Sequence, residues 1–184
     1  MGIDTSATAA SVSICEGERV LSEFFVNVKL THSQTMMPLV RAALDCAMLS
    51  LADIDVFAVA NGPGSFTGLR IGISAVKGMA FALEKPCVGV TTLEAIAQNA
   101  VSIPGILCPV MDARVKQVYN ALFESDGQRM TRLCPDRALT IAELLEELRS
   151  FDRPVILVGD GAELCYREFA EKLPQAVLAQ PNIR

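Results

Sequence analysis

Two short stretches of this 184-residue chain carry residues of the kinds that bind phosphate. Near the N-terminus, Asp4, Thr5 and Ser6 follow a short apolar segment, so one carboxylate and two hydroxyls fall in the same turn. Further on, residues 61–70 (NGPGSFTGLR) join an apolar strand pattern to a long apolar helix pattern. The first backbone amides of a helix lack partners and its dipole favours negative charge, so this turn is a candidate anion cradle.

The glycine-rich turn matches neither common nucleotide fingerprint. No Gly-Lys-Ser/Thr follows it, and its glycine spacing differs from G-x-G-x-x-G. A close-packed corner between strand and helix is the alternative interpretation, because glycine lets two backbone segments approach closely. In either case we expect Ser65 or Thr67 to cap the helix. The candidate residues of this turn are Gly62, Gly64, Ser65, Phe66, Thr67, Gly68 and Arg70.

The chain contains a single histidine, His32, in the sequence HSQTM. Two histidines four residues apart on a helix share one face and can bind one metal ion. Here the second position is Met36, whose thioether is a poor ligand for zinc or magnesium. We therefore interpret His32 as a helix-entry residue and expect no metal site. A single histidine without a nucleophile elbow also argues against a Ser-His-Asp hydrolase.

The composition is that of a folded chain rich in apolar residues. Its net charge of −5 and pI near 4.9 argue against direct nucleic-acid binding, which depends on Lys and Arg neutralising phosphates. No apolar run reaches the length of a membrane span, and the N-terminus lacks a basic and then apolar signal segment. The six scattered cysteines predict buried free thiols rather than disulfides. We expect a cytoplasmic protein.

Alternating apolar patterns and turn residues predict the same order of elements twice along the chain. The first half is expected to be β-β-β-α-β-α-β-α, and the second half repeats this order as far as its second helix. Residues 102–105 (SIPG) read as a linker, so the expected domains are residues 1–102 and 103–184. The expected strands are residues 2–4, 9–14, 20–28, 56–60, 87–90, 106–111, 115–124, 129–133 and 155–158. The expected helices are residues 36–51, 67–83, 92–101, 140–148 and 162–173.

The duplicated order predicts an α/β fold of the actin-like, sugar-kinase and Hsp70 ATPase superfamily, in which two similar lobes hold nucleotide between them. Two of the sequence features that bind phosphate in this superfamily are weakened in this chain. Ala7 stands where a flexible glycine would help the backbone approach a phosphate, and Asp112, at the equivalent place in the second half, has no hydroxyl beside it. A metal- or ATP-dependent hydrolase or phosphotransferase that uses Asp4, Thr5, Asp112 and the glycine turn stays open as the alternative function.

The helices expected at residues 36–51 and 67–83 are more apolar than packing on one sheet requires. Pro38 is tolerated only in a first turn, so Ser33 or Thr35 is expected to cap the first helix. A row of small residues on the second helix allows another helix to approach closely. We interpret both helices as a surface for a protein partner, and the alternative is burial by the second half of the chain.

The expected partner surface consists of apolar and small residues of both helices. Introducing a charge there, as in Val40→Glu or Ala75→Glu, is expected to break the complex and to leave the lobe folded. The residues of this surface are Met36, Met37, Val40, Leu44, Met48, Ile71, Gly72, Ala75, Gly78, Met79 and Ala82.

Several segments resemble the bacterial TsaB (YeaZ) family. They are DTS at 4–6, THS at 31–33, GPGSFTGLRIG at 62–72, TTLEA at 91–95 and DAR at 112–114. The glycine-rich string is long and highly specific, and the matching segments cover most of the chain. The resemblance implies an actin-like fold of two lobes and a role in making N6-threonylcarbamoyladenosine at position 37 of tRNAs that read codons beginning with A.

In that family TsaB is not the catalyst. Its paralogue TsaD carries the metal-binding histidine pair and transfers the threonylcarbamoyl group, and TsaE contributes an ATPase. The resemblance therefore implies a non-catalytic scaffold that binds TsaD through its N-terminal helices, meets TsaE through the complex, and pairs with itself when TsaD is absent. It implies no cofactor for the chain alone, with weak ATP or ADP binding expected only in the complex.

Two features depart from the family pattern. Members usually carry two or three more apolar residues before the aspartate that corresponds to Asp4, and they usually continue for about another helix after the position of residue 184. We therefore expect the second lobe to be incomplete at its end.

Overall fold

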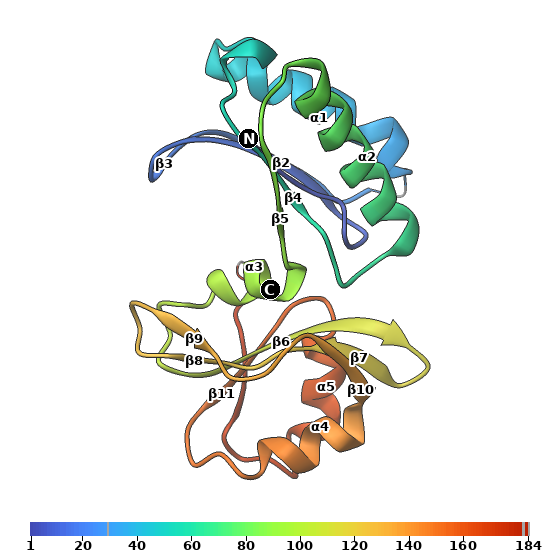
Figure 1. Ribbon diagram of the computed structural model, residues 1–184. Helices are drawn as coiled ribbons and strands as arrows, with labels where there is room; N and C mark the ends of the chain where they lie inside the picture. Colours follow the sequence, from blue (N-terminus) through green and yellow to red (C-terminus); the bar gives the residue numbers. More distant parts are fainter. Residues whose placement is uncertain (29, 182, 184) are drawn as a thin grey trace. The chain divides into compact units, whose positions relative to one another are not determined.

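The computed structural model describes residues 1–28, 30–181 and 183. The chain forms two compact units, Met1–Thr92 and Leu93–Arg184 (Figure 1). Each unit combines a β-sheet with helices, so the predicted α/β class is confirmed. Within the described residues, no helix is both long enough and apolar enough to cross a membrane.

The first unit is built on a five-stranded sheet with the order β3-β2-β1-β4-β5. Its central strand β1 (Gly2–Asp4) pairs antiparallel with β2 (Ala10–Glu16) and parallel with β4 (Phe57–Ala60). Outside these lie β3 (Arg19–Val26) and β5 (Cys87–Val90). Parallel neighbours need a long crossover connection, and helices supply it here.

Helices α1 (His32–Ala47) and α2 (Phe66–Ala82) lie next to one another and pack on one face of this sheet (Figure 1). A short 3₁₀ helix, η1 (Leu51–Asp53), follows α1. Buried apolar side chains from the strands and from both helices form one core. It comprises Ile3, Ala10, Val12, Ile14, Met36, Leu39, Val40, Ala43, Ile54, Phe57, Val59, Val76, Met79 and Ala80.

The second unit repeats this plan in the strand order β10-β7-β6-β11-β12. The additional hairpin of β8 and β9 pairs with the first half of β6. Helices α4 (Ile141–Leu148) and α5 (Ala162–Phe169) pack in the core of this unit. The strands are β6 (Gly105–Arg114), β7 (Gln117–Asn120), β8 (Phe123–Ser125), β9 (Met130–Arg132), β10 (Arg137–Thr140), β11 (Val155–Val158) and β12 (Ala176–Leu178).

The five-strand order of the first unit corresponds strand by strand to that of the second, so the predicted duplication is confirmed. The single strand predicted at 115–124 is wrong, because β7 and β8 pair with different halves of β6. The chain crosses between these pairings at Ala121, where the buried side-chain amide of Asn120 donates to the carbonyls of Pro109 and Ala121. Strands β10 and β12, of four and three residues, were not predicted.

Helix α3 (Thr92–Gln98) begins at the boundary between the two units. Residues 92–101 were predicted to belong to the first domain. In the structure, the two compact units divide after Thr92. Two contacts tie this segment to the second unit. Arg132 forms an ion pair with Glu94 at 3.1 Å, and the Ser125 hydroxyl donates to the carbonyl of Val101 at 2.5 Å.

Helix α1 begins at His32, four residues before its predicted start. The prediction of Ser33 or Thr35 as the cap is wrong, because Thr31 is the cap. The Thr31 backbone amide donates to the Gln34 side chain at 3.3 Å, which closes a capping box. Pro38 therefore lies in the second turn, where it removes one helical hydrogen bond.

Candidate functional site

The loop after β1 holds the first group of predicted site residues, and they serve the packing of the first unit. Thr5 and Ser6 are buried. The Thr5 hydroxyl donates to the backbone carbonyl of Gly68 at 2.8 Å, and the amide of Ser65 donates to the carbonyl of Ser6 at 2.6 Å. Asp4 accepts the amide of Ser6 at 2.7 Å. The loop is thus joined to the start of α2 by hydrogen bonds.

The glycines of the turn are required by this close approach. A Cβ atom at Gly64 would overlap the carbonyl of Ser6, and one at Gly68 would overlap the carbonyl of Thr5. One turn further along α2, a Cβ at Gly72 would overlap the Thr5 hydroxyl. The geometry therefore favours a close-packed corner over a phosphate cradle for this part of the motif.

The start of α2 is held by further local contacts. Ser65 is the cap, as one of the two predicted alternatives, and its hydroxyl accepts the amide of Gly68 at 3.2 Å. The amide of Thr92 donates to the carbonyl of Gly62 at 2.8 Å, which ties the turn to the end of β5. These bonds fix the direction in which α2 leaves the sheet.

His32 lies at the first position of α1, as expected for a helix-entry residue. Its Nε2 atom is 2.8 Å from the carbonyl oxygen of Ala7, so the ring links α1 to the loop after β1. Among the described residues no group of three or more His, Cys, Asp and Glu side chains is arranged to hold a metal ion.

The second unit places Asp112 beside the turn that leads into α5. The amide of Asp112 donates to a carboxylate oxygen of Asp160 at 3.3 Å, and Asp112 itself accepts the amide of Arg114 at 2.7 Å. Burial of the Asp160 carboxylate raises its pKa above the ordinary value, and the nearby charge of Asp112 raises it further. The two carboxylates are thus held by backbone amides.

The eleven residues predicted to bind a partner differ in how far they are buried. Met36, Val40, Gly72 and Met79 are buried inside the first unit. They belong to its packing, and the burial of Val40 argues against the expectation that Val40→Glu leaves the lobe folded. Three are partly buried, namely Leu44, Ile71 and Ala75. Four are exposed, namely Met37, Met48, Gly78 and Ala82.

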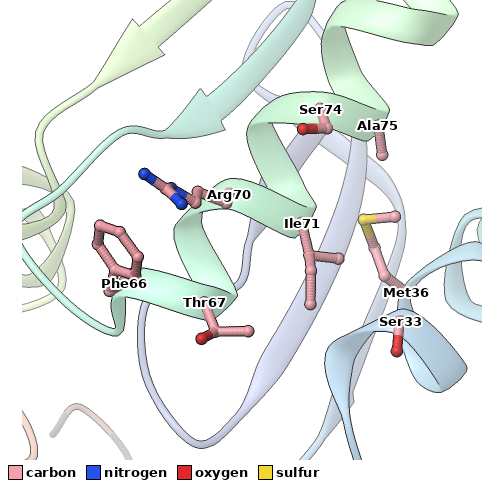
Figure 2. A pocket seen from close by; sticks show the side chains of 8 residues that line it. All are labelled: Ser33, Met36, Phe66, Thr67, Arg70, Ile71, Ser74 and Ala75. Atoms are coloured by element: carbon pink, nitrogen blue, oxygen red, sulfur yellow. The ribbon is translucent and has the colours of Figure 1, made fainter.

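A shallow groove of about 670 Å³ runs between α1 and α2. Figure 2 shows Met36 of α1 and Ile71 of α2 in the space between the helices, and Arg70 next to Phe66 on the side of α2 that is farther from α1. The Arg70 guanidinium lies 3.8 Å from the centre of the Phe66 ring, a cation–π contact. The groove is lined by Ser33, Met36, Phe66, Thr67, Arg70, Ile71, Ser74 and Ala75.

The exposed side of α2 forms a row that we call the α2 stripe: Phe66, Arg70, Ser74, Lys77 and Phe81. All five are exposed, Phe66 to 68% and Phe81 to 87%. Their spacing of three or four residues places them along one side of the helix. Phe66 and Arg70 were predicted only as turn residues and the other three were not predicted, although their regular spacing is visible in the sequence.

Comparisons with known proteins agree with this architecture. Residues 20–181 match the family model described as TsaD: tRNA N6-adenosine threonylcarbamoyltransferase. The chain is 34% identical to the tRNA threonylcarbamoyladenosine biosynthesis protein TsaB of Bacillus subtilis, over 89% of this chain and 72% of that protein. It is 38% identical to the TsaB protein of Escherichia coli, over 88% and 71% respectively.

Among solved structures, YeaZ from Pseudomonas aeruginosa superimposes with a TM-score of 0.77 at 29% identity. The match covers 97% of this chain and 82% of that one. The actin-like fold expected from the duplicated element order is therefore confirmed. With the shared fold and the sequence identity to proteins named TsaB, this chain belongs to the TsaB (YeaZ) family.

Proposed function

We propose that this chain is a non-catalytic subunit of the machinery that makes N6-threonylcarbamoyladenosine in tRNA, and that it binds and stabilises the transferase TsaD through α1 and α2. The names of its relatives place them in this pathway. The match to the TsaD family model is consistent with a partner that shares its fold.

The observation that carries the docking role is the exposed side of α1 and α2. Large apolar side chains usually avoid water, yet Met48, which caps the end of α1, is 91% exposed, and Met37, Phe66 and Phe81 are also exposed. Gly78 adds an open position on α2, since a Cβ there would meet nothing within 4 Å. Small residues next to large apolar ones let a second helix pack closely.

A scaffold role also accounts for the state of the loop after β1. The Thr5 hydroxyl, which a phosphate-binding loop would need, donates to Gly68, and Ser6 is buried. Side chains engaged in packing are a poor basis for turnover of ATP. We propose that TsaE is reached through the complex, that nucleotide binds at most weakly there, and that α1 and α2 also support a homodimer when TsaD is absent.

A reconstituted transfer reaction tests this proposal. Threonylcarbamoyl transfer to tRNA by TsaD from the same source is measured with and without this chain. Transfer should require both proteins, should be lost with Ala75→Glu in the groove, and should be retained with Asp4→Asn, whose side-chain oxygen still accepts the Ser6 amide. Full transfer by TsaD alone would refute the proposal, and ATP turnover by the isolated chain that Asp4→Ala abolishes would favour an enzyme instead.

A further inference from the structure

The α2 stripe carries positive charge on a chain that is negative overall. Helix α2 contains Arg70 and Lys77 and no acidic residue. On α1, Arg41 and Asp45 form an ion pair at 3.9 Å. The two helices therefore carry a formal charge of +2, whereas the whole chain carries −5, so the remainder carries −7. The net charge of these two helices is therefore opposite in sign to the net charge of the whole chain.

Arg70 and Lys77 are placed to act together. They are seven residues apart, two turns of helix, so both point to the same side at a separation of roughly 10 Å along the axis. No described carboxylate forms an ion pair with either of them. The face of the Phe66 ring supports the Arg70 guanidinium at 3.8 Å, which leaves the guanidinium edge available for a carboxylate.

The helix dipoles add to this positive field. Neither α1 nor α2 has an acidic residue in its first turn to offset the positive end of its dipole. Ser33 and Thr67, from these first turns, both line the groove in which Arg70 lies. The start of the groove and the α2 stripe therefore both favour a negatively charged partner.

We propose that the α2 stripe makes this face selective for a different protein with an acidic helical surface, and weakens its pairing with a second copy of this chain. A two-fold homodimer through the face brings the same basic side chains of both copies together, where like charges repel. A partner helix with carboxylates about two turns apart would instead meet Arg70 and Lys77 as ion pairs. The inference rests on the proposed docking of TsaD and names the chemistry of the surface that docks.

Charge reversal separates the two kinds of pairing. The double variant Arg70→Glu/Lys77→Glu is compared with Arg129→Glu/Lys172→Glu, which makes the same change of net charge on exposed residues of the second unit. Binding to TsaD is measured by calorimetry and self-association by sedimentation, each at 50 and 500 mM NaCl. The α2 variant should bind TsaD at least tenfold more weakly but should not self-associate more tightly, because both of its copies still present like charges. The neutral variant Arg70→Gln/Lys77→Gln removes the repulsion, so it should self-associate more tightly, while the control matches the native chain.

Salt gives a second readout that needs no substitution. For the native chain, raising NaCl should weaken the heterodimer and strengthen the homodimer. TsaD affinity that changes less than twofold with both salt and charge reversal would overturn the inference. If the native chain fails to bind TsaD at all, the proposed function fails, and self-association alone decides the charge effect. Should the double glutamate variant misfold by circular dichroism, Arg70→Gln/Lys77→Gln still tests both TsaD binding and self-association.

Discussion

The Thr5 hydroxyl donates a 2.8 Å hydrogen bond to the backbone carbonyl of Gly68, and this bond joins the loop after β1 to the first turn of α2. The two most suggestive motifs of the sequence, the Asp4–Ser6 loop and the glycine-rich turn, are therefore one packed corner. Its effect on function is indirect: it sets the position of α2, and α2 presents the surface proposed to meet a partner.

Two glycines of α2 should respond in opposite ways to alanine. In Gly68→Ala the new methyl group overlaps the Thr5 carbonyl, so the free energy of unfolding should fall by about 1–3 kcal/mol. In Gly78→Ala the methyl group meets no atom within 4 Å, so the higher helix propensity of alanine should stabilise the chain by roughly 0.5–1 kcal/mol. Urea unfolding of both variants measures the difference.

The variants Gly68→Ala and Gly78→Ala also distinguish packing within the first unit from docking to a partner. Gly78→Ala should weaken TsaD binding despite its gain in stability, because the proposed partner helix approaches closest at small residues. Equal stability of the two variants would contradict the packed corner. Unchanged TsaD binding by Gly78→Ala would argue against close helix approach at that position.

The duplicated fold was predictable because its signals are local. Strand β5 (Cys87–Val90) and strand β11 (Val155–Val158) lie at their predicted positions, since each is a short apolar run bounded by turn residues. The strands β10 and β12 were missed although they are about as short as β5 and β11, so length alone is not the reason. Their pairing is decided by partners distant in sequence, such as the register of Val155 with Ala176.

Glutamate substitutions on α1 and α2 should separate docking from folding. Ala75 is partly buried and lines the groove, so Ala75→Glu should change stability by no more than about 1 kcal/mol and weaken TsaD binding at least tenfold. Val40 is 2% exposed, so Val40→Glu should cost several kcal/mol and unfold the first unit. Thermal melts and binding isotherms measure the two effects.

Ala142→Glu, on an exposed position of α4 in the second unit, is the matched control. It should alter neither stability nor TsaD binding. Equal loss of TsaD binding in Ala142→Glu and Ala75→Glu would mean that added negative charge, and not the site of substitution, weakens the complex.

The sequence identified the helices of this face but not which sides of them are exposed. Met36 and Met37 are adjacent methionines with the same propensity, yet Met36 is buried and Met37 is exposed. An over-apolar helix leaves the direction of its inward face undetermined, because packing on the sheet decides it. The stripe from Phe66 to Phe81 was missed for the same reason, since it mixes aromatic residues at its ends with polar and charged residues between them.

Asp160 should make stability depend on pH. Its pKa is raised in the folded chain, so the neutral form is favoured, and this contribution is complete below the unfolded value near 3.9 and is lost as pH rises through the folded pKa. Asp160→Asn keeps a neutral side chain at every pH. The variant should therefore melt at a higher temperature than the native chain at pH 7 and at the same temperature below about pH 3.5. A gain that persists unchanged in acid would contradict this cause.

The prediction of buried thiols is wrong for Cys15, Cys46 and Cys87, which are exposed, so the reactivity of the cysteines should differ with their burial. Burial raises the pKa of the Cys165 thiol to about 12, and burial, with Cys165 nearby, raises the pKa of the Cys108 thiol well above its ordinary value. Only a thiolate reacts readily, so Cys15, Cys46 and Cys87, which are exposed, should be labelled by a disulfide reagent at pH 8 in the native chain. Cys108 and Cys165 should react only in denaturant. Mass spectrometry of labelled peptides assigns each site, and native labelling of Cys165 would contradict its burial.

Size-exclusion chromatography with light scattering shows whether α1 and α2 form a docking face for TsaD. The chain is run alone and mixed with TsaD from the same source. A homodimer should convert to a one-to-one heterodimer, and Ala75→Glu should prevent the conversion while Ala142→Glu does not. Two independent peaks for the native mixture would mean that the two helices do not bind TsaD.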